Sequence, residues 1–221
     1  MSGNALTLAV DASTYRGTVA VLSGHEVLAT SEVAMRGERE ERLMPAIAAA
    51  LGTAGASAAD LDRVVVGGGP GSFTSLRIGA ALAKGICLVR RIPLGAMPSL
   101  ALLVAGDARP PKDGQFLAIL DAMRGDVYAA LLEARDGTII SAERARLVSR
   151  ASVDELARSL DAHLVGAGDS PTALPHARGL ARLAPSLVRE VDIGSWEPDY
   201  GRLAEAQVKW EADHGRSLST G

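Results

Sequence analysis

The sequence predicts a two-lobed α/β protein built from duplicated βββαβα units. The same order of elements, namely three strands, a helix, a strand and a glycine turn, occurs twice along the chain. In each copy the first apolar strand ends in an aspartate, Asp11 in the first and Asp121 in the second. Residues 107–114 between the copies are charged and turn-forming, as is typical of a linker. We therefore expect a first lobe over residues 1–106 and a second over 107–221.

The first half begins with apolar and β-branched runs that indicate a three-stranded meander, with a hairpin turn at Ser23-Gly24. A helix follows in which apolar residues recur at helical spacing, and Gly52 and Gly55 fit its C-terminal cap. The expected strands span 6–10, 17–22, 26–35, 63–66 and 92–94, and the expected helices span 41–53, 75–90 and 98–104.

The second half repeats this order. Its expected strands span 116–120, 127–133, 138–148 and 163–165, with a turn at Asp136-Gly137 between the second and the third. A helix is expected over 153–160, where Ser152 and Glu155 have the spacing of a capping box. We also expect a C-terminal helix near 200–213, and its packing against the first lobe is left open.

Composition excludes several classes of protein. A content of 48% hydrophobic and 22% charged residues excludes a disordered chain, and the apolar stretches are too short to span a bilayer. One cysteine, Cys87, excludes an intramolecular disulfide and a four-cysteine zinc site. No basic residue precedes the first apolar run, so we expect no signal peptide and a cytoplasmic location. A net charge of −3 and seven aromatic residues argue against a direct grip on nucleic acid.

Histidine spacing argues against a metal centre. The chain has four histidines, and no two of them lie within one helical turn of each other. We expect neither a metal ion nor a cofactor.

The most distinctive motif is the glycine-rich loop at the start of the second helix. Its central residues are Gly69, Pro70, Gly71, Ser72, Phe73 and Thr74. Backbone N–H groups in such a loop can cradle an anion at a helix N-terminus. However, the loop lacks the Gly-Lys-Ser/Thr ending of a Walker motif, the third glycine of a dinucleotide fingerprint and the Gly-x-Ser-x-Gly of a hydrolase elbow.

The two strand-end aspartates admit two interpretations. Asp11, with Ser13 and Thr14, and Asp121 either orient Mg²⁺ or water beside phosphates, or cap the turns that follow them. Bulky Met123-Arg124 after Asp121 favours capping, because a close phosphate would require glycine there. Gly166 and Gly168 leave open a contact with an adenosine at a vestigial nucleotide site.

Four collinear segments resemble the bacterial TsaB (YeaZ) family. They are Leu6 to Thr14, Gly69 to Gly79, Asp121 to Tyr128, and Pro198-x-Tyr200-x-Arg202, and only the second is specific by itself. Ser75 replaces the usual glycine, and residues 37–45 lack a histidine common in the family. Duplicated lobes also resemble the plan of the actin, Hsp70 and sugar-kinase group.

This resemblance implies a non-catalytic subunit that binds and activates a TsaD-type catalytic subunit, with a TsaE-type ATPase as a further partner and with tRNA contacted only through the complex. The implied interface is a four-helix arrangement in which helices 41–53 and 75–90 pack against two helices of the partner. Whether the isolated chain forms a homodimer through the same helices is left open. Its expected residues are Leu43, Met44, Ile47, Leu51, Leu76, Arg77, Ala80, Ala83 and Lys84, whereas Ile78, Leu82 and Ile86 are expected to face the chain's own core. The alternatives are that the two helices cover each other within the monomer, and that the protein is an ATP-dependent small-molecule kinase. A metallopeptidase is disfavoured, because paired ligands are absent from the sequence.

Overall fold

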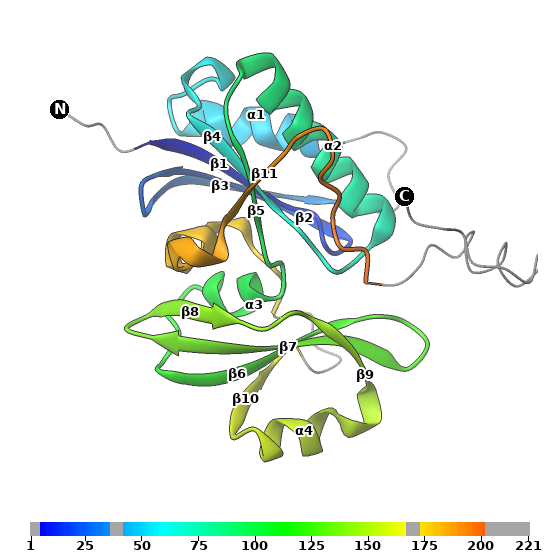
Figure 1. Cartoon of the computed structure of the whole chain (residues 1–221). Coiled ribbons are helices and arrows are strands. Elements are labelled where there is room, and N and C mark those ends of the chain that lie inside the picture. The colour runs from blue at the N-terminus through cyan, green and yellow to red at the C-terminus, as the bar shows by residue number, and fades with distance from the viewer. Residues whose placement is uncertain (1–4, 36–41, 167–172, 202–221) are drawn as a thin grey trace, which may run out of the picture.

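The protein is layered, with two β-sheets separated by a thin helical layer. A computed structural model describes residues 5–35, 42–166 and 173–201. Figure 1 shows the layers in order: helices α1 and α2, a six-stranded sheet, α3 with short 3-10 helices, a second sheet, and α4. The two-lobed α/β fold predicted from the sequence is therefore confirmed.

The elements of the first half follow the predicted order. They are β1 (Leu6–Asp11), β2 (Arg16–Ser23), β3 (Glu26–Ala34), α1 (Leu43–Thr53), η1 (Ala58–Asp60), β4 (Arg63–Gly67), α2 (Phe73–Arg90), β5 (Leu94–Met97) and α3 (Ala101–Ala105). The predicted C-terminal cap of α1 is confirmed at Gly55, which has φ of +68° and whose N–H donates to Gly52 O at 3.1 Å, whereas Gly52 lies within the helix. Helix α2 begins two residues before the expected start.

The second half contains β6 (Gly114–Asp121), β7 (Asp126–Arg135), β8 (Thr138–Ala142), β9 (Arg146–Ser149), η2 (Arg150–Ser152), α4 (Val153–Ser159), β10 (Ala162–Val165), η3 (Ala177–Arg182), η4 (Pro185–Leu187) and β11 (Arg189–Val191). The predicted capping box of α4 is wrong. The chain enters α4 from the 3-10 turn η2, so Ser152 Oγ donates to Ser149 O at 2.9 Å and makes no cap bond.

Strand pairing shows the duplication directly. The sheet orders are β11-β5-β4-β1-β2-β3 and β10-β6-β7-β8, with β9 also paired to β7. In the first sheet β1 is antiparallel to β2 and parallel to β4, and in the second β6 is antiparallel to β7 and parallel to β10. The two aspartates that end β1 and β6 therefore occupy equivalent positions.

The second copy departs from the first after β10. Its described residues contain no counterpart of α2, and the chain instead forms η3 and η4 before β11 pairs antiparallel with β5 of the first sheet. The expected C-terminal helix lies almost wholly outside the described residues, and the boundary between lobes at residue 106 stays a prediction.

Three apolar clusters form the core. One lies between the first sheet and helices α1 and α2, the largest lies between the two sheets around α3, and the third lies under α4. Among the described residues, no helix is long and apolar enough to cross a membrane.

Candidate functional site

The glycine-rich loop is packed closely against the rest of the chain. A Cβ at Gly67 would overlap Asp11 Oδ2, and a Cβ at Gly71 would overlap the carbonyl oxygen of Ser13. Gly69 has φ of +87°, and a Cβ there would overlap the carbonyl oxygen of Asp199. These glycines therefore allow other atoms of the protein to approach the loop more closely than a side chain would permit.

The backbone N–H groups of the loop also have partners within the chain. Gly68 N donates to Met97 O at 2.8 Å, and Ser72 N donates to Ser13 O at 2.7 Å. Gly69 N donates to Ser99 Oγ at 3.0 Å. Three donors of the potential anion cradle are thus already used.

Asp11 connects β1 to this loop. Its side chain is fully buried; Oδ1 accepts hydrogen bonds from Ser13 N at 3.0 Å and Ser13 Oγ at 2.7 Å, and Oδ2 accepts one from Ser99 Oγ at 2.7 Å. Burial raises the pKa of Asp11 and outweighs the opposing effect of these hydrogen bonds. Thr14 is engaged in the same turn, where its Oγ1 accepts from Arg16 N at 3.1 Å. Asp11 therefore makes the hydrogen bonds that the turn-capping interpretation predicts.

Asp121 caps an exposed turn in the second lobe. Its Oδ1 accepts from Met123 N at 3.2 Å and lies 3.5 Å from Arg150 Nη2. Met123 and Arg124 have φ of 65° and 58°, so two bulky residues occupy the left-handed region. The obstruction of a phosphate site at this turn stays a prediction.

Gly166 and Gly168 are the two glycines expected to contact an adenosine. A Cβ at Gly166 would overlap Ile119 O, so this glycine serves packing behind β10. Gly168 lies outside the described residues.

Residues 196–201 link the glycine-rich loop to both lobes; we call them the crossing segment. Little in the sequence pointed to this segment. Asp199 N donates to Gly68 O at 2.8 Å. The rings of Tyr200 and Phe73 lie 4.6 Å apart, and Tyr128 of the second lobe donates its hydroxyl to Tyr200 O at 3.3 Å. Only the weak Pro198-x-Tyr200 motif pointed to this segment, because its partners are distant in sequence.

A cavity of about 290 Å³ lies beside the crossing segment. Its walls come from the glycine-rich loop, the start of α3 and the second sheet, and the ion pair of Arg144 with Asp199, at 3.6 Å, lies at its edge. The lining residues are Gly69, Pro70, Pro98, Leu100, Ala101, Ala130, Leu132, Ala142, Glu143, Arg144, Ala145 and Asp199.

The expected interface residues divide into two groups. Six are buried in the chain's own core, namely Leu43, Ile47, Leu51, Leu76, Ala80 and Ala83. Ala83 is 1% exposed, and the neighbouring Gly79 would bring a Cβ within 3.1 Å of Ala12 Cβ. The small residues of this face therefore allow α2 to approach its own sheet, and the expectation that Ala80 and Ala83 face a partner is corrected. Ile78, Leu82 and Ile86, expected to face the core, are only partly buried.

The remaining three expected residues lie nearer to solvent. Met44 is 42% exposed, and the Arg77 guanidinium lies 4.7 Å above the Phe73 ring. Lys84 Nζ lies 3.6 Å from Glu197 and 5.9 Å from the centre of the Trp196 ring. Arg77 and Lys84 thus stand on the side of α2 that faces the crossing segment.

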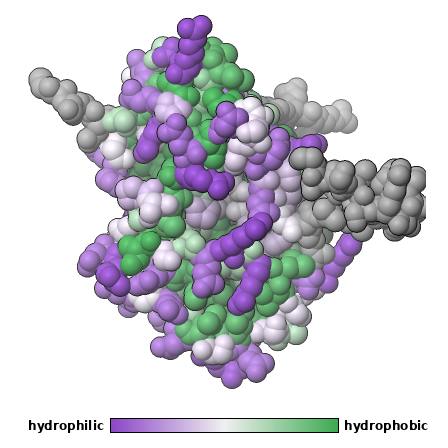
Figure 2. Space-filling model, viewed as in Figure 1, coloured by the Kyte–Doolittle hydropathy of each residue, from purple (hydrophilic) through white to green (hydrophobic). Residues whose placement is uncertain are grey.

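The solvent-facing surface of α1 and α2 contains exposed apolar and small residues; we call the surface formed by these residues the outer helix face. Both helices lie on the same side of the first sheet, α1 over β2 and β3 and α2 over β1 and β4 (Figure 1). Leu88 is 63% exposed and Val89 is 84% exposed, and Figure 2 shows hydrophobic atoms gathered where α2 ends. The exposed small residues of this face are Ala48, Ala49, Gly52, Ala81 and Gly85.

Comparison with known proteins finds consistent relatives. Residues 32–173 match the family model of TsaD, tRNA N6-adenosine threonylcarbamoyltransferase. The Bacillus subtilis tRNA threonylcarbamoyladenosine biosynthesis protein TsaB is 31% identical, with 92% of this chain and 96% of that protein aligned, and the Escherichia coli TsaB is 31% identical over 76% of this chain and 73% of its own length. YeaZ from Pseudomonas aeruginosa has the same fold, with a TM-score of 0.71, 23% identity and coverage of 89% of this chain and 99% of that chain.

Proposed function

The chain belongs to the TsaB (YeaZ) family, and from this premise we propose that it serves as a non-catalytic subunit that binds and activates a TsaD-type catalytic subunit. Membership of the family gives it a role in tRNA threonylcarbamoyladenosine biosynthesis. The catalytic subunit would supply the chemistry of threonylcarbamoyl transfer, and this chain would supply a docking surface.

The outer helix face is the observation that carries the proposal. Exposed large apolar side chains such as Leu88 and Val89 mark surfaces where another protein packs. Small residues at Ala81 and Gly85 allow a second helix to approach closely. The face thus has both the apolar area and the low relief that helix-to-helix docking requires.

Relatedness to TsaD supports the choice of partner. The matched residues, 32–173, include all of α1 and α2. A TsaD-type subunit is therefore expected to have counterparts of both helices, so the two related chains can pack like the halves of a pseudo-twofold dimer. The same reasoning allows a homodimer of the isolated chain, and contacts with a TsaE-type ATPase and with tRNA are proposed to form only in the assembled complex.

The kinase alternative has less support. Three backbone donors of the glycine-rich loop, those of Gly68, Gly69 and Ser72, are engaged within the chain, and Asp11 is buried and bonded to Ser99 and Ser13. Magnesium-dependent ATP turnover by the pure protein, lost in Asp11→Asn, would favour the kinase and contradict the proposal.

Titration calorimetry with the TsaD-type subunit tests the docking surface. Ala81→Trp and Ala49→Trp each place a large side chain on the outer helix face and should weaken binding roughly tenfold to a hundredfold, the equivalent of about 1–3 kcal/mol of overpacking. Ala151→Trp makes the same change at an exposed alanine beside α4, at the far end of the molecule, and should bind as the wild type does. Unchanged affinity in both outer-face variants would place the contact elsewhere.

A further inference from the structure

The linker between the two halves is held by arginines of the 3-10 helix η3. Arg182 Nη1 lies 2.7 Å from Asp107 O, 3.1 Å from Arg109 O and 3.3 Å from Ala105 O, and its Nη2 lies 3.4 Å from Ala108 O. One guanidinium group therefore contacts four carbonyl oxygens of the segment that leaves α3.

Arg178 completes the set. Its Nε donates to Gly106 O at 2.7 Å, the carbonyl that Arg182 does not contact. Five successive carbonyl groups, from residue 105 to residue 109, are thus turned towards two cations. Hydrogen bonds from a charged donor are about twice as strong as neutral ones, and a planar guanidinium offers five donors in a fixed arrangement.

The start of the linker needs such partners. Helix α3 is wholly buried and ends at Ala105, where a helix leaves its last carbonyl groups without partners of its own. Unpaired carbonyl groups at a buried helix end are costly, so the two arginines both satisfy this end and determine the path of the chain that follows.

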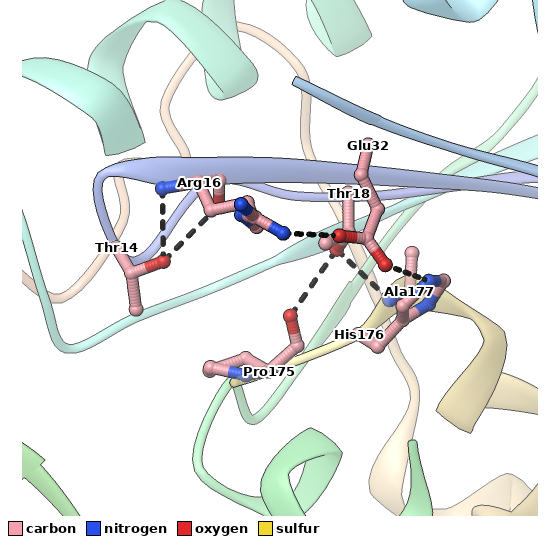
Figure 3. Close-up of polar contacts among 7 residues, drawn as sticks. All are labelled: Thr14, Arg16, Thr18, Glu32, Pro175, His176 and Ala177. Atoms are coloured by element: carbon pink, nitrogen blue, oxygen red, sulfur yellow. Dashed lines mark hydrogen bonds and ion pairs between the residues drawn. The ribbon is translucent and has the colours of Figure 1, made fainter. Parts of the chain in front are cut away.

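Helix η3 is itself anchored to the first sheet. Thr18 Oγ1 of β2 accepts from Ala177 N at 3.0 Å and donates to Pro175 O at 3.3 Å (Figure 3). Beside it, His176 Nε2 lies 3.3 Å from Glu32 of β3. The N-terminal end of η3 is therefore fixed to the first lobe.

The residues after η3 reach the second sheet. Ala184 N donates to Ile139 O of β8 at 2.9 Å, and Leu183 forms a bridge with Ile139. Helix η3 consequently contacts the first lobe and the linker, and the residues that follow it contact the second lobe.

We propose that Arg182, supported by Arg178, is the positioning residue that fixes the angle between the lobes, because it holds the linker carbonyls in one conformation. The angle is then set by the chain itself and needs no ligand between the lobes. This inference concerns the rigidity of the molecule and does not rest on the proposed partner.

Spin-label distances across the lobes test the proposal. Ala49→Cys on α1 and Glu155→Cys on α4 are exposed positions, one in each lobe, and the natural Cys87 is fully buried, so labels attach only where intended. The wild-type protein should give one narrow distance distribution. Arg182→Met should broaden or shift it, Arg182→Lys should do so less, and Arg189→Met, at an exposed arginine of β11, should leave it unchanged.

Hydrogen exchange keeps the proposal falsifiable if Arg182→Met folds poorly. Gly106 N donates to Leu102 O at 2.9 Å and Asp107 N donates to Val104 O at 3.3 Å. In folded Arg182→Lys these two amides should exchange at least roughly tenfold faster, since the linker is released locally. Distances and exchange rates that match the wild type in the folded variants would overturn the proposal.

Discussion

At the scale of single residues, neighbouring glycines of one loop have different tasks. Gly67 lies against the buried carboxylate of Asp11, whereas an added Cβ at Gly68 would make only ordinary contacts, the nearest at 3.5 Å from Met97 O. The sequence predicts a glycine-rich loop but not this difference, because the atoms that crowd Gly67 come from β1 and from residue 99.

Alanine should therefore destabilise the protein at Gly67 and have little effect at Gly68. Gly67→Ala should lower the free energy of unfolding by at least the roughly 1–3 kcal/mol of overpacking, since Asp11 and Ser99 must move. Gly68→Ala should change it by less than about 0.5 kcal/mol, as expected for substitutions without a specific mechanism. Urea unfolding measures both, and equal effects would contradict the packing described for the loop.

The single cysteine should be unreactive in the folded protein. Cys87 is fully buried on α2 and its Sγ lies 3.6 Å from Pro93 O. Burial raises the pKa of the Cys87 thiol to about 11, so almost no thiolate is present at neutral pH. Ellman's reagent should label the protein only after denaturation, and rapid labelling of the native protein would contradict the burial of this side chain.

At the scale of elements, the two glycines at the C-terminal end of α1 have different roles. Gly52 lies within the helix and Gly55 follows it with φ of +68°, and an added Cβ would meet nothing within 4 Å at either position. Packing is thus equal at the two sites, and only the backbone conformation differs.

The same substitution, glycine to alanine, should therefore change the stability in opposite directions at these two positions. Gly52→Ala should stabilise the protein by roughly 0.5–1 kcal/mol, because alanine is the better helix residue. Gly55→Ala should destabilise it by about 1–2 kcal/mol, because the left-handed conformation strains a residue with a Cβ. Thermal unfolding of the two variants beside the wild type checks this; a lower melting temperature for Gly52→Ala would be inconsistent with it.

Helix α2 shows where sequence reasoning fails at this scale. Its existence and its approximate span were predictable from the length of the apolar run between the loop and Arg90. Its orientation was not, because small or apolar residues surround most of the helix and several faces suit a core. Ala80 and Ala83 face the sheet since their small side chains let the helix sit close, and the bulkier Leu82 lies at the edge of the contact.

At the scale of the whole molecule, acid should weaken the attachment of η3 to the first sheet. His176 is 5% exposed; its Nδ1 accepts from Arg178 N at 3.1 Å, and its Nε2 faces Glu32, which also pairs with Arg16. Burial, together with the charge of Arg178, lowers the pKa of His176 below 6.5, against the opposing effect of Glu32. Protonation of Nδ1 would also break the bond from Arg178 N.

The sign of the pH effect follows from linkage. The unfolded chain binds the His176 proton near pH 6.5, whereas the folded chain binds it only at lower pH. Neutral His176 should therefore make its full contribution to the free energy of unfolding above pH 6.5. The free energy of unfolding should decline as the pH falls below 6.5 towards the lower pKa of the folded state. His176→Gln should flatten this decline, and identical pH profiles for wild type and His176→Gln would refute the assignment.

The duplicated architecture was predictable because each copy carries its own local signals, such as apolar strands, glycine turns and a strand-end aspartate. The return of the chain to the first sheet was not. Strand β11 spans three residues, Arg189–Val191, without an apolar pattern, and its place is fixed only by its pairing with β5 nearly one hundred positions earlier. The crossing segment of the candidate site was not predictable for the same reason, since it is defined by contacts with residues far away in the sequence.

The pairing of β11 with β5 also sets an order of events during synthesis. Strand β5 is made early, yet the strand that covers its outer edge emerges only after the entire second sheet has been translated. Until then the nascent first lobe presents an unpaired edge, the kind of surface on which strands of other chains add. Ribosome-bound chains that stop before residue 189 should consequently depend more on chaperones than those that extend past residue 191.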